Sequence, residues 1–270
     1  MIEQGFHLSA SQREDLLRRY RKTEVPPLSY GTVADFCDSC DHLPYLSGIQ
    51  ADLKDLQRPA ALKMIVGACS PGASLLEIGA GEPYVAQMLV DLGYRVTVVD
   101  PYDGSGRGPT EFDYYQSKYP DLRLVRSTFS DEVDLGESHS FDCIYSISVL
   151  EHVHQPFLGS LFRGVSRFLK RGGYSLHLID HVLSGEGADF HLMQLADIVS
   201  LQANLSGRSN AEVLAGFHRV MANASTDVET FFLSPVGHNQ WRGQVAYSAF
   251  PFRRVISINS CERYESPGPS

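Results

Sequence analysis

The residues best suited to ligand chemistry lie in Leu75–Tyr84, where an acid and two glycines are spaced as Glu77-x-Gly79-x-Gly81. The apolar residues before Glu77 predict a short buried strand, the glycines predict a tight turn, and the apolar spacing that follows predicts a helix. Glycines one residue apart at the carboxyl end of a parallel strand let the backbone approach a ligand closely. The pattern therefore predicts a site for a nucleotide-like ligand.

The neighbours of the glycines argue against one class of nucleotide. A dinucleotide fingerprint that starts at Gly79 requires a third glycine at position 84, where this chain has Tyr84. Glu82 and Pro83 stand where the helix begins, and we expect the Glu82 carboxylate to use the exposed helix amides itself. A pyrophosphate would meet that negative charge. A nicotinamide oxidoreductase thus stays only an alternative.

A second acid, Asp100, follows the next predicted strand, residues 94–99. An acid at the end of that strand can accept hydrogen bonds from both ribose hydroxyls, and its distance from the glycines is that of a βαβ unit. The Glu77 carboxylate can accept hydrogen bonds from an amino group of the ligand. Together these residues resemble the first two motifs of class I S-adenosylmethionine-dependent methyltransferases. The loop departs from the family at Pro83, where a small residue is usual.

The resemblance extends to Phe141–Val153, which has the pattern of a buried strand that runs into a polar turn. Its Leu-Glu-His ending is similar to the family's fourth motif, and the likeness covers about residues 55–180. The family implies S-adenosyl-L-methionine as the cofactor and S-adenosyl-L-homocysteine as the product, with the adenine held after a third strand. The implied cofactor residues are Glu77, Gly79, Gly81, Asp100, Thr128, Phe129 and Ser146.

The resemblance also implies the fold class, which is α/β. We expect a Rossmann-like class I methyltransferase sheet, mostly parallel with an antiparallel last strand, plus a helical N-terminal cap and a helical insertion. Two alternatives are a glycine turn that binds no cofactor and a methyltransferase-like scaffold that is not catalytic.

Three histidines are candidates for a catalytic base. Methyl transfer from a sulfonium is an in-line displacement, so a base is needed only where the acceptor is a hydroxyl that must lose its proton. Asp180 and His181 follow the strand predicted at Tyr174–Ile179, and such a strand end flanks the methyl group in this fold. His152 is the second candidate and His238 the third, since histidine titrates near neutrality. For each of them, a structural histidine bonded to backbone or solvent remains the alternative.

The acceptor is expected to be a small molecule. The loop before the last strand carries His238, Trp241 and Arg242, which we assign to the acceptor site. A roofed cleft with aromatic residues suits a compact, partly apolar metabolite, and several candidate bases favour O-methylation. N-methylation and C-methylation remain alternatives.

The pattern of metal-ligand types predicts no metal site. Cys37 and Cys40, with His42 nearby, have zinc-like spacing, but a fourth ligand and a second matched pair are missing at the expected distance. A divalent-metal site is a weaker alternative. Its ligands would be Asp180, His181, Asp189 and His191.

The supporting elements divide the chain into a cap, a main domain and a tail. We expect residues 1–52 to form the helical cap and 53–262 the methyltransferase domain, with a flexible tail at 263–270. Helical patterns cover 11–21 and 53–68, and the glycine-rich Pro101–Pro109 is expected to be mobile. Two more helical patterns, about 191–202 and 210–222, form an insertion over residues 184–225 that can roof the acceptor pocket. Ser209 and Glu212 give the second of them a capping box.

The remaining elements complete the predicted sheet. Residues 122–126 are expected to form the third strand, and a helix opened by Pro156 is expected to close at Lys170–Gly173. Further strands are expected near Val228–Leu233 and at Arg254–Asn259, the last one antiparallel and inserted beside its predecessor.

The composition limits the partners. The chain has 270 residues, 43% of them hydrophobic, which is enough for one large α/β domain with a sizeable core. A formal charge of −9 and no cluster of Lys and Arg with aromatics predict that no nucleic acid is bound. The five cysteines come with no export signal, which predicts reduced thiols and a cytoplasmic location. The sequence has no apolar run of 18 residues, which predicts no membrane association.

Overall fold

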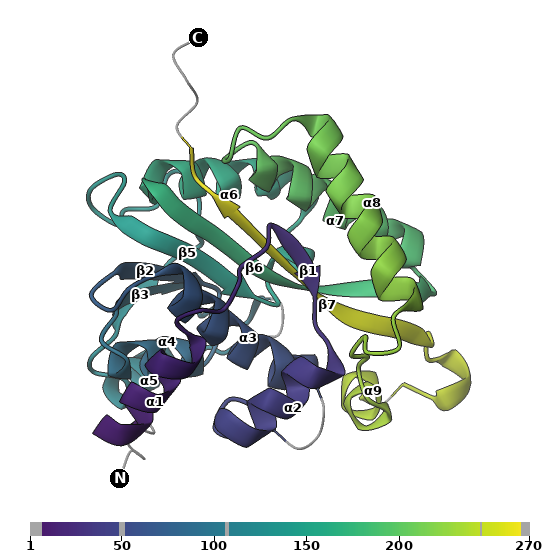
Figure 1. Ribbon diagram of the computed structural model, residues 1–270, viewed down its shortest axis with the longest axis horizontal. Coiled ribbons are helices and arrows are strands. Elements are labelled where there is room, and N and C mark those ends of the chain that lie inside the picture. Colours follow the sequence, from purple (N-terminus) through teal and green to yellow (C-terminus); the bar gives the residue numbers. More distant parts are fainter. Residues whose placement is uncertain (1–6, 49–51, 106–107, 244, 266–270) are drawn as a thin grey trace.

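The computed structural model describes residues 7–48, 52–105, 108–243 and 245–265 (Figure 1). Its helices are α1 (Ala10–Tyr20), α2 (Val33–His42), α3 (Leu53–Ala68), α4 (Tyr84–Asp91), α5 (Phe112–Lys118), η2 (Leu150–His152), α6 (Gln155–Phe168), α7 (Ala188–Ala203), α8 (Asn210–Thr226), α9 (Pro235–Arg242) and η3 (Tyr247–Ala249). Its strands are β1 (Leu28–Tyr30), β2 (Ser74–Ile78), β3 (Arg95–Asp100), β4 (Arg123–Arg126), β5 (Phe141–Ile147), β6 (Leu169–Gly185) and β7 (Arg253–Arg263).

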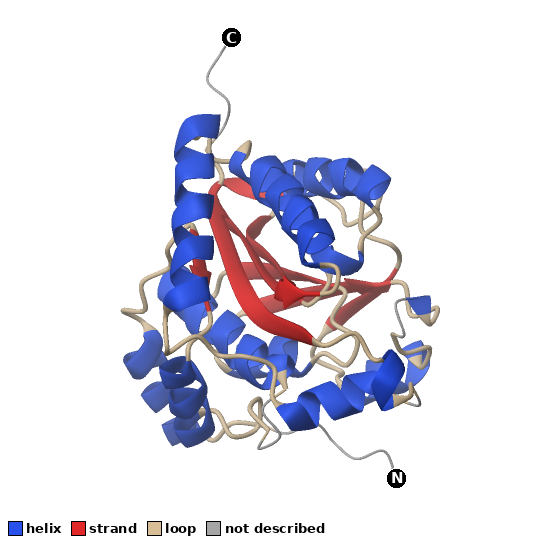
Figure 2. Ribbon diagram, turned by 90° about the vertical axis from the view of Figure 1, so that its right-hand side faces the viewer, coloured by secondary structure: helices blue, strands red, loops and turns tan. Residues whose placement is uncertain are grey.

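The strands form one sheet in the order β1-β7-β6-β5-β2-β3-β4, with helices on both faces (Figure 2). The neighbours from β6 to β4 pair in parallel, whereas β7 is antiparallel to both β6 and β1. The predicted Rossmann-like sheet, mostly parallel with an antiparallel last strand, is confirmed. The chain turns from β2 toward β3 on one side and from β5 toward β6 on the other. This reversal between β2 and β5 is where such sheets bind ligands.

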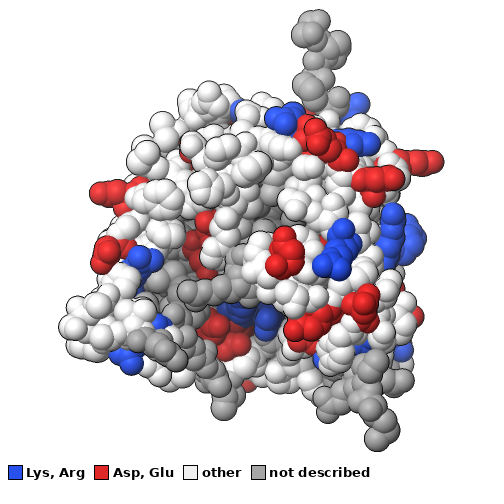
Figure 3. Space-filling view, turned by 180° about the vertical axis from the view of Figure 1, so that it is seen from behind, with Lys and Arg blue, Asp and Glu red and all other residues white. Residues whose placement is uncertain are grey.

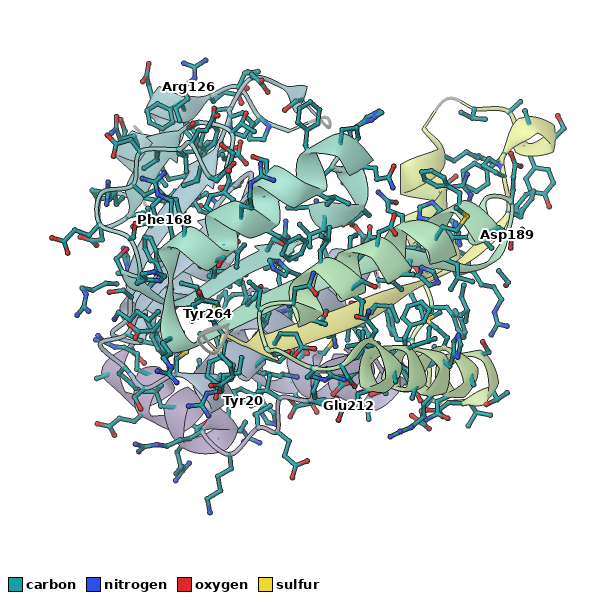
Figure 4. The ribbon with its side chains drawn as sticks, turned by 90° about the horizontal axis from the view of Figure 1, so that it is seen from above. Tyr20, Arg126, Phe168, Asp189, Glu212 and Tyr264 are labelled. Atoms are coloured by element: carbon teal, nitrogen blue, oxygen red, sulfur yellow. The ribbon has the colours of Figure 1, made fainter. Side chains whose placement is uncertain are left out.

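Each face of the sheet has its own core because successive strand residues point to opposite faces. Leu75 is buried with α1, α3 and α4, while the next residue, Leu76, is buried with α6 and α7. Figure 4 shows α6 and α7 side by side over the sheet, with Phe168 and Tyr264 near one end and Asp189 near the other. None of the described helices is both long and apolar enough to cross a membrane.

The amino end of β6 differs from the prediction. Lys170–Gly173 do not close the preceding helix, because α6 ends at Phe168 and the strand begins at once. A Cβ on Gly173 would lie 2.8 Å from the Asp142 carbonyl oxygen, so this glycine permits a close approach of two strands. Lys170 is bound by the Asp142 carboxylate at 2.9 Å. The cations and glycines of this run therefore serve the sheet and not a helix terminus.

The carboxyl end of β6 also differs. The predicted strand stops at Ile179, but β6 continues to Gly185 and pairs with β7 along this extension. Asp180 and His181 therefore lie inside the strand and not after it. Since strand residues alternate, their side chains point to opposite faces of the sheet.

The strand predicted near Val228–Leu233 is wrong. Of the described residues in that stretch, Thr230 forms an isolated bridge with Thr32, and the ladder does not extend beyond this single pair. The outer place in the sheet belongs instead to β1, where Tyr30 pairs with Ile258 of β7. The N-terminal segment thus contributes an edge strand as well as helices, because β7 offers its free edge to the nearest extended segment.

The helices of the 184–225 insertion pack on the sheet. In α7, Leu195 and Ile198 are buried against β6, and α8 packs on α7 and β1 through Phe217. The predicted capping box of Ser209 and Glu212 at the start of α8 is confirmed. The first turns of α7 contact η2, where Gln194 donates to the Glu151 carbonyl at 2.9 Å.

Candidate functional site

A cavity of about 490 Å³ opens at the carboxyl ends of β2, β3 and β5. Its walls come from the glycine loop, the residues after β4, η2 and the first turns of α3 and α6. Seen from behind, the molecule is hollowed near the middle of its face, and acidic side chains lie around the hollow (Figure 3). The volume falls within the range of small-molecule and cofactor pockets.

The glycine loop forms one wall because its backbone takes conformations that side chains disfavour. Gly79 and Gly81 have φ angles of +68° and +60°. A Cβ on Gly79 would also lie 2.8 Å from Cγ2 of Val149, which lines the same cavity. The backbone is held in place because the Gly79 amide donates to the carbonyl of Val99 at 2.8 Å.

Asp100 ends β3 with its carboxylate fixed by two backbone amides. Gly81 donates to Oδ2 and Tyr102 donates to Oδ1, each at 2.9 Å. Each carboxylate oxygen has a second lone pair that can accept from a ligand hydroxyl. Tyr102 is fully buried, so it anchors a connection that the sequence predicts to be mobile.

Glu77 is the buried acid of the site. It is 3% exposed, and Tyr145 donates to its Oε2 at 2.9 Å. Burial raises the pKa of Glu77 to about 7, opposed by the hydrogen bond from Tyr145 and by the charge of Arg58. A cationic ligand group beside it would restore the ionised form.

The residues assigned to the adenine side divide into two groups. Thr128 and Phe129 line the cavity, Thr128 exposed and Phe129 6% exposed. Ser146 is fully buried, and its hydroxyl is hydrogen-bonded to Nδ1 of His177 at 2.8 Å. The structure therefore brings together every sequence-assigned cofactor residue except Ser146, which points toward the α6 side of the sheet with His177.

Glu82 does not cap α4 as predicted. Pro83 is the N-cap residue, and it provides no side-chain hydrogen bond to the helix. The Glu82 carboxylate instead accepts from Tyr84 at 2.6 Å, Lys118 at 2.7 Å and Tyr119 at 2.8 Å. Lys118 is the last residue of α5 and Tyr119 is its C-cap. Their sequence distance from Glu82 does not predict that they contact it.

Two cations on the cavity wall were not predicted from the sequence. Lys54 and Arg58 are four residues apart on α3 and therefore share one face of that helix. The guanidinium of Arg58 lies 5.1 Å from the centre of the Tyr84 ring, within cation–π distance. The sequence did contain a signal for them, because Lys54 and Arg58 are spaced i, i+4 just after the N-cap of the helix that precedes β2.

His152 is the candidate base that lines the cavity. It ends η2 and is exposed at the cavity wall. Partial desolvation and the charge of Lys54 lower the pKa of His152. Its imidazole is therefore neutral at pH 7 and able to accept a proton.

His181 is placed differently. It is 2% exposed, points to the α6–α7 face of the sheet and is absent from the described residues of the cavity wall. Burial and the charge of His191 lower the pKa of His181 to about 4. The expected position after the strand, on which its assignment depended, is wrong because β6 is longer.

Four residues form a second polar cluster, which we call the carboxyl cluster: Gln57 on α3, Ser148 just after β5, Glu151 in η2 and Asp180 within β6. Asp180 accepts from Gln57 Nε2 at 2.8 Å and from the Ser148 hydroxyl at 3.2 Å. Glu151 Oε1 accepts from the Asp180 amide at 3.1 Å. Burial raises the pKa of both carboxyl groups. Ser148 also lines the cavity, so the cluster adjoins it.

The acceptor residues assigned from the sequence lie on α9, and they are not among the described cavity residues. The His238 ring packs against Phe250 with centroids 6.0 Å apart. Arg242 donates to Oδ1 of Asn239 at 3.1 Å. Trp241 belongs to α9, but its side chain lies outside the described residues.

The residues considered for metals do not come together as a metal site in the described part of the chain. Cys37 is exposed and Cys40 half-buried on α2, where Sγ of Cys40 lies 3.6 Å from Ser47 Oγ. Asp189 is exposed at the start of α7, and the described residues contain no group of three or more His, Cys, Asp or Glu arranged to hold a metal.

A family model described as a methyltransferase domain matches residues 46–204, which is more than half of the chain. No protein of curated description matches the sequence significantly.

Two solved structures illustrate the likeness of overall fold. One is phosphoethanolamine N-methyltransferase 2 of Haemonchus contortus, at 19% identity and a TM-score of 0.49, over 86% of this chain and 60% of that chain. The other is geranyl diphosphate C-methyltransferase of Streptomyces coelicolor A3(2), at 14% identity and a TM-score of 0.47, over 95% of this chain and 99% of that chain. At these values, neither likeness informs the choice of acceptor.

Proposed function

The chain belongs to the methyltransferase domain family, as a class I S-adenosylmethionine-dependent enzyme, and on this premise we propose that it methylates a hydroxyl group of a small molecule. Its cofactor, S-adenosyl-L-methionine, supplies an electrophilic methyl group and leaves as S-adenosyl-L-homocysteine. The observation that carries the proposal is the position of His152, a neutral imidazole on the wall of the same cavity as the glycine loop.

The cofactor fits the residues that surround the cavity. Gly79 and Gly81 leave room where a Cβ would not fit or would strain the backbone, so a ligand can lie against the loop. Asp100 has spare lone pairs for the ribose hydroxyls. Glu77 binds the amino group of the methionine moiety, and Arg58 binds its carboxylate. Thr128 and Phe129 border the adenine.

In this proposal, His152 and not His181 is the general base. A base must reach the hydroxyl proton, and His152 stands on the cavity wall whereas His181 is buried on the other side of β6. A pKa of about 4 would also make His181 a weak base at neutral pH. Asp180 is not among the described residues of the cavity wall, so we assign it to the carboxyl cluster and not to proton transfer.

The acceptor is small and partly apolar. The cavity wall beside His152 includes Val153, Phe157 and Leu161, which suit an apolar body. We assign the acceptor pocket to this wall, the first turns of α7 in the 184–225 insertion and the N-terminal segment that carries α2. His238, Trp241 and Arg242 are retained as outer residues of this pocket.

The test is transfer of a labelled methyl group from the donor to a metabolite extract, with the product identified by mass spectrometry. His152→Ala should lower the turnover number by roughly 10²–10⁴-fold while binding of S-adenosylhomocysteine is kept. His218→Ala, which removes an exposed histidine on α8, is the matched control and should leave turnover unchanged.

Two outcomes would contradict the proposal. Label on nitrogen or carbon would exclude O-methylation. A loss in His152→Ala no larger than in His218→Ala would remove the base assignment, and a large loss in His181→Ala at intact donor binding would return that role to His181.

A further inference from the structure

The carboxyl cluster contains more hydrogen-bond acceptors than donors. Its donors are the Gln57 amide, the Ser148 hydroxyl and the backbone amides of Glu151 and Asp180, and all of them already serve the two carboxyl groups. Two buried acceptor atoms, Gln57 Oε1 and Glu151 Oε2, have no hydrogen-bond partner among the described residues. Buried polar atoms normally have partners, so both atoms point to a missing donor.

The cluster is also short of positive charge. The ion pairs of the described residues do not include Glu151 or Asp180. Asp52 adds a further negative charge near Asp180, and Lys54 supplies the opposing positive charge. Two neighbouring carboxyl groups in such surroundings share a proton unless a cation joins them.

The cluster adjoins the cavity through Ser148. Ser148 and His152, which precede and follow Glu151 in the sequence, line the cavity, and the side chains of Glu151 and Asp180 behind them are half-buried. Ser148 has a φ angle of +55°, a conformation that costs free energy in a residue other than glycine. This backbone places the Ser148 hydroxyl beside both carboxyl groups.

We propose that the carboxyl cluster binds a protonated amino group of the methyl acceptor, so that the acceptor is an amino alcohol. An ammonium group brings three donors and one positive charge, which are what the cluster lacks. The inference rests on the proposed function, because it identifies the acceptor class of the same enzyme. A protonated amine has no lone pair to attack the methyl group, so the amine anchors the molecule while its hydroxyl is presented to His152.

The test compares two probes that differ only in the amino group. 6-Aminohexan-1-ol and hexane-1,6-diol are titrated into the protein saturated with S-adenosylhomocysteine, and heat is measured at millimolar concentrations of probe. The amino alcohol should bind at least about tenfold more tightly than the diol, since an ammonium adds charge-assisted hydrogen bonds. Repeating the titration in buffers of different ionisation enthalpy should show release of the proton shared by the two carboxyl groups.

Glu151→Gln and Asp180→Asn should each reduce the preference for the amine by about tenfold, because each removes one charge and keeps the shape. Glu82→Gln is the matched control, since Glu82 also lines the cavity but is paired with Lys118, and its preference should stay that of the parent protein. Binding of S-adenosylhomocysteine should be unchanged in Glu151→Gln and Asp180→Asn.

Equal affinity for the two probes, no measurable binding of the amine, or a preference that persists in both cluster variants would overturn the inference. These outcomes are separate from failure of the proposed function. If S-adenosylhomocysteine does not bind, or if label appears on nitrogen or carbon, the proposed O-methylation fails whatever the probes show.

Discussion

The two sides of the cavity differ in how far the protein satisfies its own polar groups. On the donor side, the Asp100 carboxylate accepts two backbone amides and Glu77 accepts the Tyr145 hydroxyl. On the acceptor side, Gln57 and Glu151 each keep a buried oxygen without a partner in the described structure. The described carboxylates of the donor side thus have hydrogen-bond donors within the protein, whereas the acceptor side keeps two buried oxygens unpaired.

This difference teaches which interactions are preorganised. A site built on backbone amides at strand ends keeps its geometry before the ligand arrives, so little free energy is spent on reorganisation. Side chains from separate elements that leave atoms unpaired gain their last hydrogen bonds on binding. Substitutions on the donor side should therefore act mainly through geometry, and those on the acceptor side through charge and protons.

The largest expected effect tests the geometry of the donor side. Gly79→Ala should weaken binding of S-adenosylhomocysteine by more than about 100-fold, because a Cβ there is both strained and pressed against Val149. Gly72→Ala is the matched control: Gly72 has a φ angle of +91°, but a Cβ there has nothing within 4 Å. Calorimetric titration of both variants with S-adenosylhomocysteine measures the two affinities. Equal affinities would show that crowding against Val149 adds nothing to the effect of backbone strain.

The next effect concerns Asp100. Asp100→Ala should weaken S-adenosylhomocysteine binding by roughly 1.5–3 kcal/mol, which is about 10–150-fold, through loss of hydrogen bonds to a charged acceptor. The substitution also leaves the Gly81 and Tyr102 amides without their acceptor. Asp103→Ala is the control, because Asp103 follows β3 in the same loop and accepts from the Ser105 amide. This variant should bind S-adenosylhomocysteine as tightly as the parent protein does. Unchanged affinity in a folded Asp100→Ala protein would remove Asp100 from the donor site.

A smaller effect uses the raised pKa of Glu77. The folded protein binds the Glu77 proton more tightly than the unfolded chain does, so stability is largest below pH 4.5 for this group and falls as the pH rises to about 7. Glu77→Gln removes that dependence. The free energy of unfolding of Glu77→Gln relative to the parent protein should therefore increase by roughly 1–3 kcal/mol from pH 5 to pH 8.

Urea unfolding at both pH values measures this difference without ligand. Glu132→Gln, at an exposed position, is the control and should show a flat difference. A flat difference for Glu77→Gln as well would mean that Glu77 titrates as an ordinary surface carboxylate. Donor binding should fall in Glu77→Gln at the same time, which separates the function of this group from its contribution to stability.

The smallest expected effect concerns mobility on the acceptor side. Phe190 and Met193 are 65% and 71% exposed on the first turns of α7, whereas Ile198 is fully buried. Amides of 188–194 should exchange about tenfold faster than those of 195–203, and should be protected when the amino alcohol and S-adenosylhomocysteine are both bound. Hydrogen exchange read by mass spectrometry decides this. Equal protection of 188–194 and β2 in the ligand-free protein would count against a responsive acceptor side.

The donor side could be predicted from the sequence because it is local. Glu77, Gly79 and Gly81 lie within five residues, and Asp100 follows after one helix and one strand, so their spacing already contains the geometry. The confirmed sheet was expected from the family resemblance that these residues carry. Ser146 was assigned by its place in a motif, and strand alternation turned it to the other face.

The acceptor side could not be predicted because it joins distant residues. Gln57 and Asp180 are 123 residues apart in the sequence and meet only when α3 packs on β6. The amino end of β6 was hidden by Lys170–Gly173, whose cations and glycines also suit a helix terminus, and its carboxyl end extends beyond Ile179 by pairing with β7. Pairing with β7 decided the outcome, and the same long-range pairing placed β1 at the edge where a strand had been expected near Val228–Leu233.

The edge strand β1 has a consequence for how the chain is made. Ser29 and Asn259 are hydrogen-bonded across β1 and β7 although 230 residues separate them. At about 5–20 residues per second, a ribosome adds those residues in roughly 10–50 s. Throughout that time the segment around Leu28 is without its partner strand. Sheet closure therefore waits until β7 has been translated, and the segment around Leu28 is the one that a chaperone would have to shield.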